Sequence, residues 1–175
     1  QAMKRMVDDF RDYARLPAPE VAALDLNALI SEVLGLYESS SAAIETRFAG
    51  ELPQVLGDST QLRQIIHNLL RNSEDALEGR HGIIKIVTER AGRHARLLIS
   101  DNGPGFPVEL LPRIFEPYVT TKARGTGLGL PIVRKIVDEH QGTIEISNAP
   151  EGGARIDIRL PMAKEEAKYG NHSGR

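Results

Sequence analysis

The chain has 175 residues, of which 41% are hydrophobic and 26% are charged, and its 22 Lys and Arg against 24 Asp and Glu leave a net charge of −2. This balance is typical of a globular protein and, at roughly 150 residues per domain, predicts one domain with a short appendage. The chain contains no cysteine, which excludes disulfides, thiolate metal sites and a cysteine nucleophile. Its near-neutral charge and few aromatic residues argue against nucleic-acid binding, and no apolar run is long enough to span a membrane.

The N-terminus predicts an amphipathic helix over residues 1–16, which two prolines then end. The apolar stripe of this helix includes Met3, Met6, Phe10 and Tyr13. Two interpretations are open: the helix packs on its own domain, or it is half of a helical hairpin whose stripe faces a partner. The immediate proline break favours the hairpin. Residues 17–26 are expected to be a linker, residues 27–163 a domain, and residues 164–175 a polar, flexible tail.

The central part predicts helices that alternate irregularly with short strands. Helices are expected from Asn27 to the serines at 39–41, from Asp58 to Gly79 and near 129–141; strands at 44–48, 83–89, 95–101, 143–147 and 154–160; and a turn at 52–57. The second of these helices has a capping box, because Gln61 follows Asp58 at the required spacing. Without regular βαβ alternation, these elements predict an α+β fold, a two-layer α/β sandwich with helices on one face of a largely antiparallel sheet.

Two glycine-rich turns could bind a ligand. Residues 101–105 (DNGPG) follow an apolar strand, so Asp101 offers a carboxylate to a purine-type amino group, while Gly103 and Gly105 allow close approach to the backbone. A plain tight turn is the alternative. Residues 125–130 (GTGLGL) open a helix, where backbone N–H groups and the helix dipole form a phosphate cradle. This second turn matches neither the P-loop nor the Rossmann pattern.

A polar edge runs along the central helix. Gln64, Asn68, Asn72 and Asp75 share one face because they lie three or four residues apart. Two amides one turn apart can present oxygens to Mg²⁺, which prefers a few protein oxygens together with substrate phosphates. A solvated helix face is the alternative, and we expect Asp75 and Arg71 to be surface or pairing residues.

The segment between the two turns predicts a loop that closes over a polyanion. Residues 115–127 (FEPYVTTKARGTG) carry hydroxyls, two cations and glycines. Closure would exclude water, and Lys122 could neutralise a terminal phosphate. A solvated surface loop is the alternative.

Together and in this order, the asparagine helix, DNGPG, FEPYVTTK, GTGLGL and EGGARIDIRLP resemble the ATP-binding domain of sensor histidine kinases, of the GHKL or HATPase superfamily. The resemblance extends over about residues 25–161. It implies the Bergerat-type fold, in which ATP and Mg²⁺ lie between the asparagine helix and a flexible lid. It also implies an ATP-dependent phosphotransferase of a two-component system, which transfers the γ-phosphate to a histidine for relay to a response regulator.

The resemblance further implies roles for individual residues. Asn72 would bind Mg²⁺, Asn68 would organise the phosphates, and Asp101 would bind the adenine amino group, with Gly103 and Gly105 allowing close approach. The remaining nucleotide-binding residues would be Phe115, Lys122, Gly125, Thr126, Gly127, Leu128 and Gly129. Of all these residues, Asn68 and Lys122 would take part directly in catalysis.

Three departures from the family pattern sharpen this expectation. Related domains that hydrolyse ATP have a glutamate at the position of Asn68, and an amide cannot act as a base, so phosphoryl transfer is favoured over hydrolysis. Arg155 stands where the family often has Thr or Ser, and we assign it no role. None of the five histidines lies in the family's acceptor context, H-E-[IL]-[RK]-N-P, so the phosphoacceptor is expected outside this chain.

The N-terminal stretch MKRMVDDFRDYARLPAPE resembles the end of the dimerisation hairpin of nitrogen-regulation kinases of the NtrY/NtrB type. The expected partners are therefore the dimerisation domain of the same protein and a response regulator. The full-length protein is expected to be a homodimer anchored in the bacterial inner membrane, with this fragment soluble in the cytoplasm and contacting neither membrane nor nucleic acid. One alternative is a nucleotide-binding regulatory module of the same fold without kinase activity. A hydrolytic ATPase clamp is a second alternative, which Asn68 disfavours.

Overall fold

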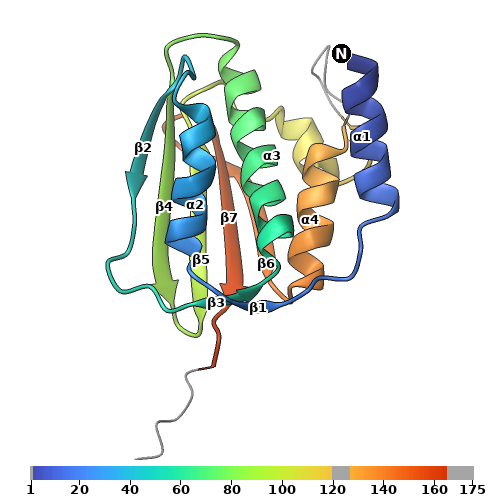
Figure 1. The fold of residues 1–175 in the computed structure, drawn as a ribbon. Coiled ribbons are helices and arrows are strands. Elements are labelled where there is room, and N and C mark those ends of the chain that lie inside the picture. Colours follow the sequence, from blue (N-terminus) through green and yellow to red (C-terminus); the bar gives the residue numbers. More distant parts are fainter. Residues whose placement is uncertain (1, 120–126, 165–175) are drawn as a thin grey trace, which may run out of the picture.

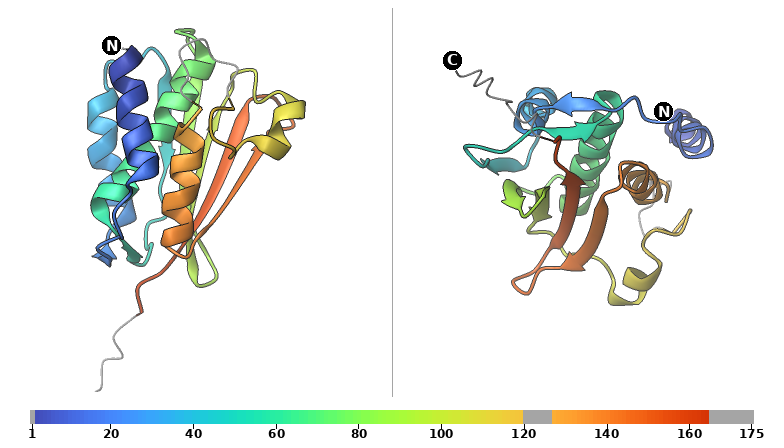
Figure 2. Two further views of the ribbon diagram at one scale, coloured as in Figure 1. Left: turned by 90° about the vertical axis from the view of Figure 1, so that its right-hand side faces the viewer. Right: turned by 90° about the horizontal axis from the view of Figure 1, so that it is seen from below.

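The structure is a computed structural model that describes residues 2–119 and 127–164. Its elements are α1 (Ala2–Ala14), β1 (Ala22–Leu24), α2 (Leu26–Leu34), the 3₁₀ helix η1 (Gly35–Tyr37), β2 (Ala43–Arg47), β3 (Val55–Gly57), α3 (Ser59–Leu77), β4 (Ile83–Ala91), β5 (His94–Asp101), the 3₁₀ helix η2 (Val108–Arg113), α4 (Gly129–Glu139), β6 (Thr143–Asn148) and β7 (Ala154–Pro161). A five-stranded sheet, β2-β4-β5-β7-β6, carries α2, α3 and α4 on one face, while β1 and β3 form a small second sheet at one end (Figures 1 and 2). The predicted two-layer α+β sandwich is confirmed.

The strand register decides which side chains face the helices. Strand β2 pairs parallel with β4, and the other neighbours in the large sheet pair antiparallel. Along β5, Ala95, Leu97, Ile99 and Asp101 are buried and alternate with less buried residues, as a period of two requires. Asp101 therefore ends the strand on the core side of the sheet, where it is 8% exposed.

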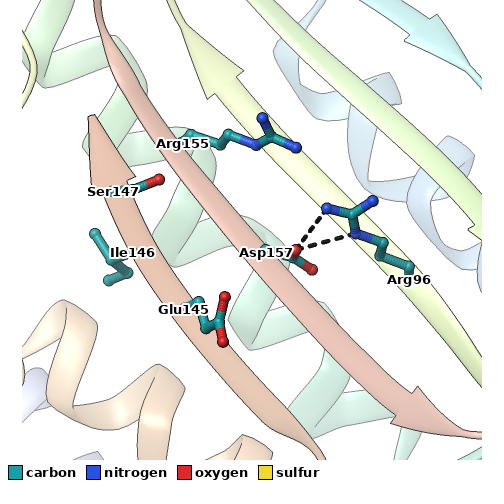
Figure 3. A pocket seen from close by; sticks show the side chains of 6 residues that line it. All are labelled: Arg96, Glu145, Ile146, Ser147, Arg155 and Asp157. Atoms are coloured by element: carbon teal, nitrogen blue, oxygen red, sulfur yellow. Dashed lines mark hydrogen bonds and ion pairs between the residues drawn. The ribbon is translucent and has the colours of Figure 1, made fainter. Parts of the chain in front are cut away.

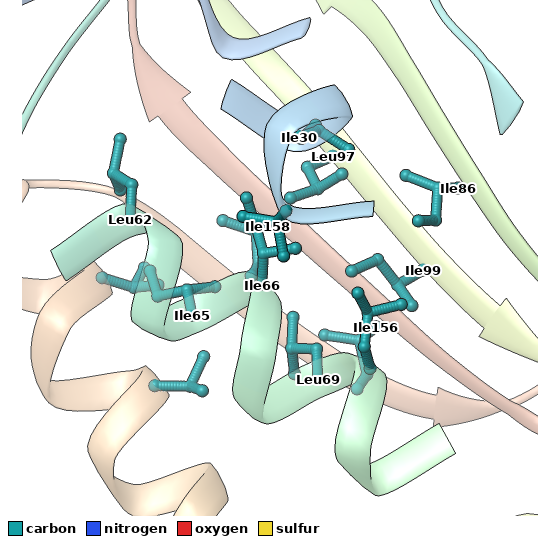
Figure 4. Packing of buried hydrophobic residues seen from close by; sticks show 14 of the residues in the cluster. Ile30, Leu62, Ile65, Ile66, Leu69, Ile86, Leu97, Ile99, Ile156 and Ile158 are labelled. Carbon is teal, nitrogen blue, oxygen red and sulfur yellow. The ribbon is translucent and has the colours of Figure 1, made fainter. Parts of the chain in front are cut away.

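Helix α3 forms the centre of the core. Its apolar stripe includes Ile65, Ile66, Leu69 and Leu70, all at most 2% exposed. Figure 4 shows Ile66 and Leu69 facing the inward side chains of β5 and β7. Burial of this stripe fixes the rotation of α3, so its opposite, polar edge must point away from the sheet.

The N-terminal cap of α3 ties three segments together. Asp58 accepts a hydrogen bond from the Gln61 backbone N–H at 3.1 Å, and its own N–H donates to Nε2 of the buried His140 at 3.0 Å. Gln61 does not complete the predicted capping box, because its amide donates to the Pro17 carbonyl at 2.8 Å. Burial acts to raise the pKa of Asp58, but backbone donors including Glu20 and Gln61 outweigh it and lower the pKa below its usual value.

Two short strands depart from the sequence expectation. Residues 22–24, expected in a linker, pair antiparallel with residues 55–57, expected in a turn. Strands of three residues are too short to show the alternation on which strand prediction depends. Their pairing joins the expected linker directly to the domain.

Helix α2 begins one residue earlier than expected. Asp25 is its N-cap and accepts from the Ala28 N–H, whereas Asn27 lies inside the helix. The Asn27 amide instead donates to the Ala49 carbonyl at 2.9 Å and accepts from the Thr88 hydroxyl at 2.7 Å. Asn27 therefore joins α2 to β4 and the loop after β2, a long-range role that its local sequence does not reveal.

Helix α1 lies beside α4 (Figures 1 and 2). Met3, Met6 and Phe10 are 78%, 53% and 54% exposed. Tyr13 leaves this stripe and packs against the core, with the Lys135 ammonium 5.6 Å from its ring centre. The helix therefore contacts its own domain while most of its apolar stripe faces outward.

The core predicts a clear difference between two leucine truncations. Leu69→Ala should lower the free energy of unfolding by about 2–5 kcal/mol, because Leu69 is fully buried at the contact of α3 with the sheet. Urea denaturation monitored by circular dichroism would measure the change. Leu36→Ala is the matched control, since Leu36 is 72% exposed and should cost no more than about 0.5 kcal/mol. Equal losses in both variants would contradict this packing.

Candidate functional site

The two asparagines of α3 lie at the start of α4. The Asn68 amide donates to the Gly129 carbonyl at 3.4 Å, across the contact between the two helices. A β-carbon added at Gly129 would lie 3.7 Å from the Asn72 amide oxygen, an ordinary contact distance, so Asn72 lies beside the start of α4. The structure thus brings Asn68, Asn72 and Gly129 together, although they are far apart in the sequence.

The turn after β5 forms a second cluster, next to the C-terminal part of α3. Asp101 Oδ1 accepts from the Gly103 N–H at 2.9 Å and from the Ala154 N–H at 3.4 Å. These two donors orient the carboxylate. A side chain at Gly103 would come within 3.0 Å of Asp101 Oδ1 and 3.3 Å of the Ala76 carbonyl, so only glycine fits without a shift. Because Ala76 follows Asn72 by one turn of α3, the two clusters are neighbours along one helix.

Two residues that support this turn were missed from the sequence. Asn148 accepts from the Phe106 N–H at 2.8 Å and donates to the Phe106 carbonyl at 2.8 Å, which clamps the end of the turn. The second missed residue is Gly153, whose φ of +88° lies in the region that favours glycine, as does the φ of +77° at the predicted Gly105. The paired glycines at 152–153, directly before a strand, were a usable sequence signal for Gly153, whereas no local pattern marks Asn148.

The segment after η2 is anchored at its base. Phe115 packs partly buried against the core, and the Arg134 guanidinium of α4 lies 4.8 Å from its ring centre. The Tyr118 N–H donates to the Gly127 carbonyl at 2.9 Å, and Gly127 has φ +70°. Leu128 is fully buried. The predicted residues Lys122, Gly125 and Thr126 lie outside the described residues.

These groups can bind complementary parts of one ligand. Asp101 is a carboxylate acceptor at the edge of the core, suited to an amino group. The amides of Asn68 and Asn72 offer oxygens for a hard cation, and the start of α4 offers the positive end of a helix dipole for phosphate. The chemistry of this donor set therefore fits a purine nucleotide with Mg²⁺.

A hollow of about 440 Å³ lies elsewhere, on the face of the sheet that the helices leave open (Figure 3). Arg96 in this hollow donates twice to Asp157, at 3.0 and 2.7 Å, and once to Glu89 at 2.6 Å. Hydrogen bonds to these acids raise the Arg96 pKa above its already high value. The hollow shares no residue with the two clusters on α3, and its central arginine is already paired, so it is not part of the site.

Within the described ranges, none of the helices combines the length and the apolar character that crossing a membrane requires.

Comparison with known proteins identifies relatives. The family described as "Histidine kinase-, DNA gyrase B-, and HSP90-like ATPase" matches residues 57–164. The nitrogen regulation protein NtrY of Azorhizobium caulinodans is 39% identical over 174 residues, which are 94% of this chain and 22% of that protein. The chain spans less than a third of the length of the NtrY-type relatives it matches.

Solved structures agree with this relationship. Full-length ShkA in complex with AMPPNP is similar with a TM-score of 0.82 and 28% identity, covering 94% of this chain and 37% of that one. The histidine kinase ThkA in complex with the response regulator protein TrrA is similar with a TM-score of 0.79 and 32% identity, covering 92% of this chain and 47% of that one.

The geometry of the turn predicts the effect of a single methyl group. Gly153→Ala should lower the free energy of unfolding by about 1–3 kcal/mol, because its φ is unfavourable for alanine and the added carbon would collide with the Asp101 carbonyl. Urea denaturation would measure the loss. Gly50→Ala is the matched control, since nothing lies within 4 Å of its new carbon, and it should leave stability nearly unchanged. An unchanged free energy of unfolding in Gly153→Ala would contradict this contact.

Proposed function

The chain belongs to the family of histidine kinase-, DNA gyrase B- and HSP90-like ATPases, and from this premise we propose that residues 27–163 are the catalytic ATP-binding domain of a two-component sensor histidine kinase. One observation supports the proposal most directly: the amide edge of α3 is hydrogen-bonded to the start of α4, with the Asp101 carboxylate next to the same helix. The names of the relatives, among them NtrY, support the kinase assignment and a role in nitrogen regulation.

Adenine would be held at the end of β5. The Asp101 carboxylate, oriented by two backbone N–H groups, would accept a hydrogen bond from the adenine amino group. Gly103 and Gly105 would let the ring approach the backbone, since neither carries a side chain at the turn. An AMPPNP complex of the similar protein ShkA supports a nucleotide ligand.

The phosphates would lie between the amide edge of α3 and the predicted lid, the segment 115–127. Asn72 would bind Mg²⁺, and Asn68 would orient the phosphates beside it. Backbone N–H groups from Gly125 to Gly129, with Thr126 and Leu128 between them, would cradle the triphosphate at the N-terminus of α4. When bound, Mg²⁺ would neutralise phosphate charge. Phe115 would anchor the lid at its base, and Lys122 would reach the terminal phosphate.

The proposed reaction is phosphoryl transfer to a histidine that lies outside this chain. An acceptor imidazole nitrogen would attack the γ-phosphorus while the bond to the β-phosphate oxygen breaks, which yields phosphohistidine and ADP. The protein would contribute positioning and charge neutralisation. Asn68 stands where hydrolytic relatives have a base, so water is not activated at that position.

The N-terminal helix would belong to the dimerisation hairpin. Met3, Met6, Val7 and Phe10 are exposed on α1 and would pack into a four-helix bundle with a second copy. The phosphohistidine would be read by a response regulator, in line with the ThkA complex with TrrA. The intact homodimer would be anchored in the bacterial inner membrane, with this domain in the cytoplasm.

Replacing the adenine acceptor should weaken nucleotide binding strongly. Asp101→Asn should weaken the affinity for ATP by about a hundredfold, because a hydrogen bond to a charged group is lost and an amide donor is turned toward the amino group. Isothermal titration calorimetry with ATP and Mg²⁺ measures the change.

The matched control is Asp138→Asn, which removes an aspartate charge from an exposed ion pair with Arg134 on α4. Its ATP affinity should equal that of the unchanged protein. Unaltered affinity in Asp101→Asn would exclude the adenine assignment.

The transfer itself can be tested with a dimerisation hairpin supplied in trans. Labelled ATP should yield acid-labile phosphohistidine on the hairpin, and Asn72→Ala should reduce this transfer at least about tenfold by weakening Mg²⁺ binding. A hairpin whose acceptor is changed to alanine is the negative control.

Nucleotide binding without any transfer would instead favour a regulatory module of the same fold. Steady phosphate release in the absence of the hairpin would favour a hydrolytic ATPase. Full transfer by Asn72→Ala would exclude the proposed metal role.

A further inference from the structure

Helix α1 turns its polar side, and not its apolar stripe, toward α3. Three contacts join the two helices: Arg5 to Asp75 at 3.4 Å, Asp9 to Arg71 at 3.8 Å, and Gln64 to Asp12 at 2.9 Å. All three partners on α3 lie on or beside the amide edge that carries Asn68 and Asn72. The N-terminal helix therefore places charged side chains beside the candidate nucleotide site.

The middle contact reaches the site itself. Asp9 is only 7% exposed, the most deeply buried acid described on α1. The guanidinium of Arg71, which Asp9 faces, also donates to the Asn68 amide oxygen at 3.4 Å. One arginine thus links the N-terminal helix to a residue of the proposed phosphate site.

Arg71 has capacity for a further acceptor. Its Nε has no hydrogen-bond partner among the described residues, and because this nitrogen is buried, a phosphate could reach it only after a rearrangement around Arg71. The Asn68 amide nitrogen is directed to the Gly129 carbonyl at the start of α4, so its oxygen, and with it Arg71, lies beside the proposed phosphate cradle. A planar guanidinium with an unused donor is well suited to phosphate oxygens.

We propose that Arg71 is a phosphate-binding residue of the nucleotide site, and that Asp9 of the N-terminal helix competes with the nucleotide for it. With α1 in the position seen here, the Asp9 carboxylate neutralises Arg71. Nucleotide phosphates would bind Arg71 only when Asp9 moves away from it. This inference rests on the proposed ATP site and adds to it a residue and a competitor.

The charge on α1 favours this competition. Asp9 and Asp12 both contact α3, and burial, followed by repulsion from Asp9 and Asp8, raises the pKa of Asp12. A triphosphate near Arg71 would meet the same negative charges at short range, where screening by solvent is weak. Nucleotide binding and docking of α1 therefore oppose each other, and linkage requires that each weakens the other by the same factor.

The first test compares ATP affinities by calorimetry at fixed, low salt. Asp9→Asn keeps the size of the side chain and removes its charge, and should tighten binding of ATP and Mg²⁺ by about five-fold. Arg71→Gln should weaken binding by about ten-fold, because a cation at the phosphates is lost. In the double variant the gain from Asp9→Asn should disappear, since both changes act through one arginine.

The matched control is Glu32→Gln, which removes the acid from another arginine pair of α3, Arg63 with Glu32 at 2.7 Å. That pair lies away from the α1 contact, and the affinity should not change. Unchanged affinity in Asp9→Asn, or an equal gain in the presence of Arg71→Gln, would overturn the inference. The proposed function itself fails, as a distinct outcome, if the unchanged protein does not bind ATP or if Asp101→Asn binds ATP as tightly as the unchanged protein.

The second test follows the helix directly. Because the sequence contains no cysteine, Met6→Cys on α1 and Glu139→Cys on α4 can carry a unique pair of spin labels. Addition of AMPPNP and Mg²⁺ should increase the population with a longer distance between the labels, and Asp101→Asn should abolish this change. An unaltered distance distribution at saturating nucleotide would overturn the competition between Asp9 and the nucleotide.

Discussion

Burial of the apolar stripe of α3 against the sheet is the constraint on which the rest of the structure depends. With Ile66 and Leu69 held in the core, the rotation of the helix is set, and its amide edge has to face α4 and the outer helix α1. The same helix meets the end of β5, where Asp101 is buried on the core side. One packing interaction therefore positions both the amides and the carboxylate.

Glycines and an asparagine clamp maintain the site where backbones approach closely. Gly103 and Gly153 stand where a side chain would collide with Asp101 or its carbonyl, and Asn148 holds the end of the turn with two hydrogen bonds. These positions determine the shape of the turn. They allow the Asp101 carboxylate to keep the orientation that two backbone donors define, which is the kind of preorganisation that binding sites require.

The contacts of α1 give the polar edge of α3 a second role. An amphipathic helix would ordinarily bury its apolar stripe, yet α1 exposes Met3 and Phe10 and directs Asp9 toward Arg71. Both faces are then engaged in the proposed dimeric kinase, the apolar one by a second copy and the acidic one by the catalytic domain. A change in the position of this helix would alter the surroundings of Asn68 through a single residue, Arg71, which contacts both Asp9 and Asn68.

Much of the fold and of the candidate site could be predicted from the sequence, because local patterns determine it. Local patterns marked the long helix and all five strands of the large sheet, and DNGPG and GTGLGL are turns whose glycines act within a few residues. Patterns of this kind could not reveal β1 and β3, which are too short to alternate, or the bonds of Asn27 and Asn148, whose partners are distant in sequence. The sequence by itself determined which chemical groups are available to the proposed nucleotide site. Only the tertiary structure decided that α1 presents its acids to Arg71, because that choice depends on which face of a helix finds a partner in space.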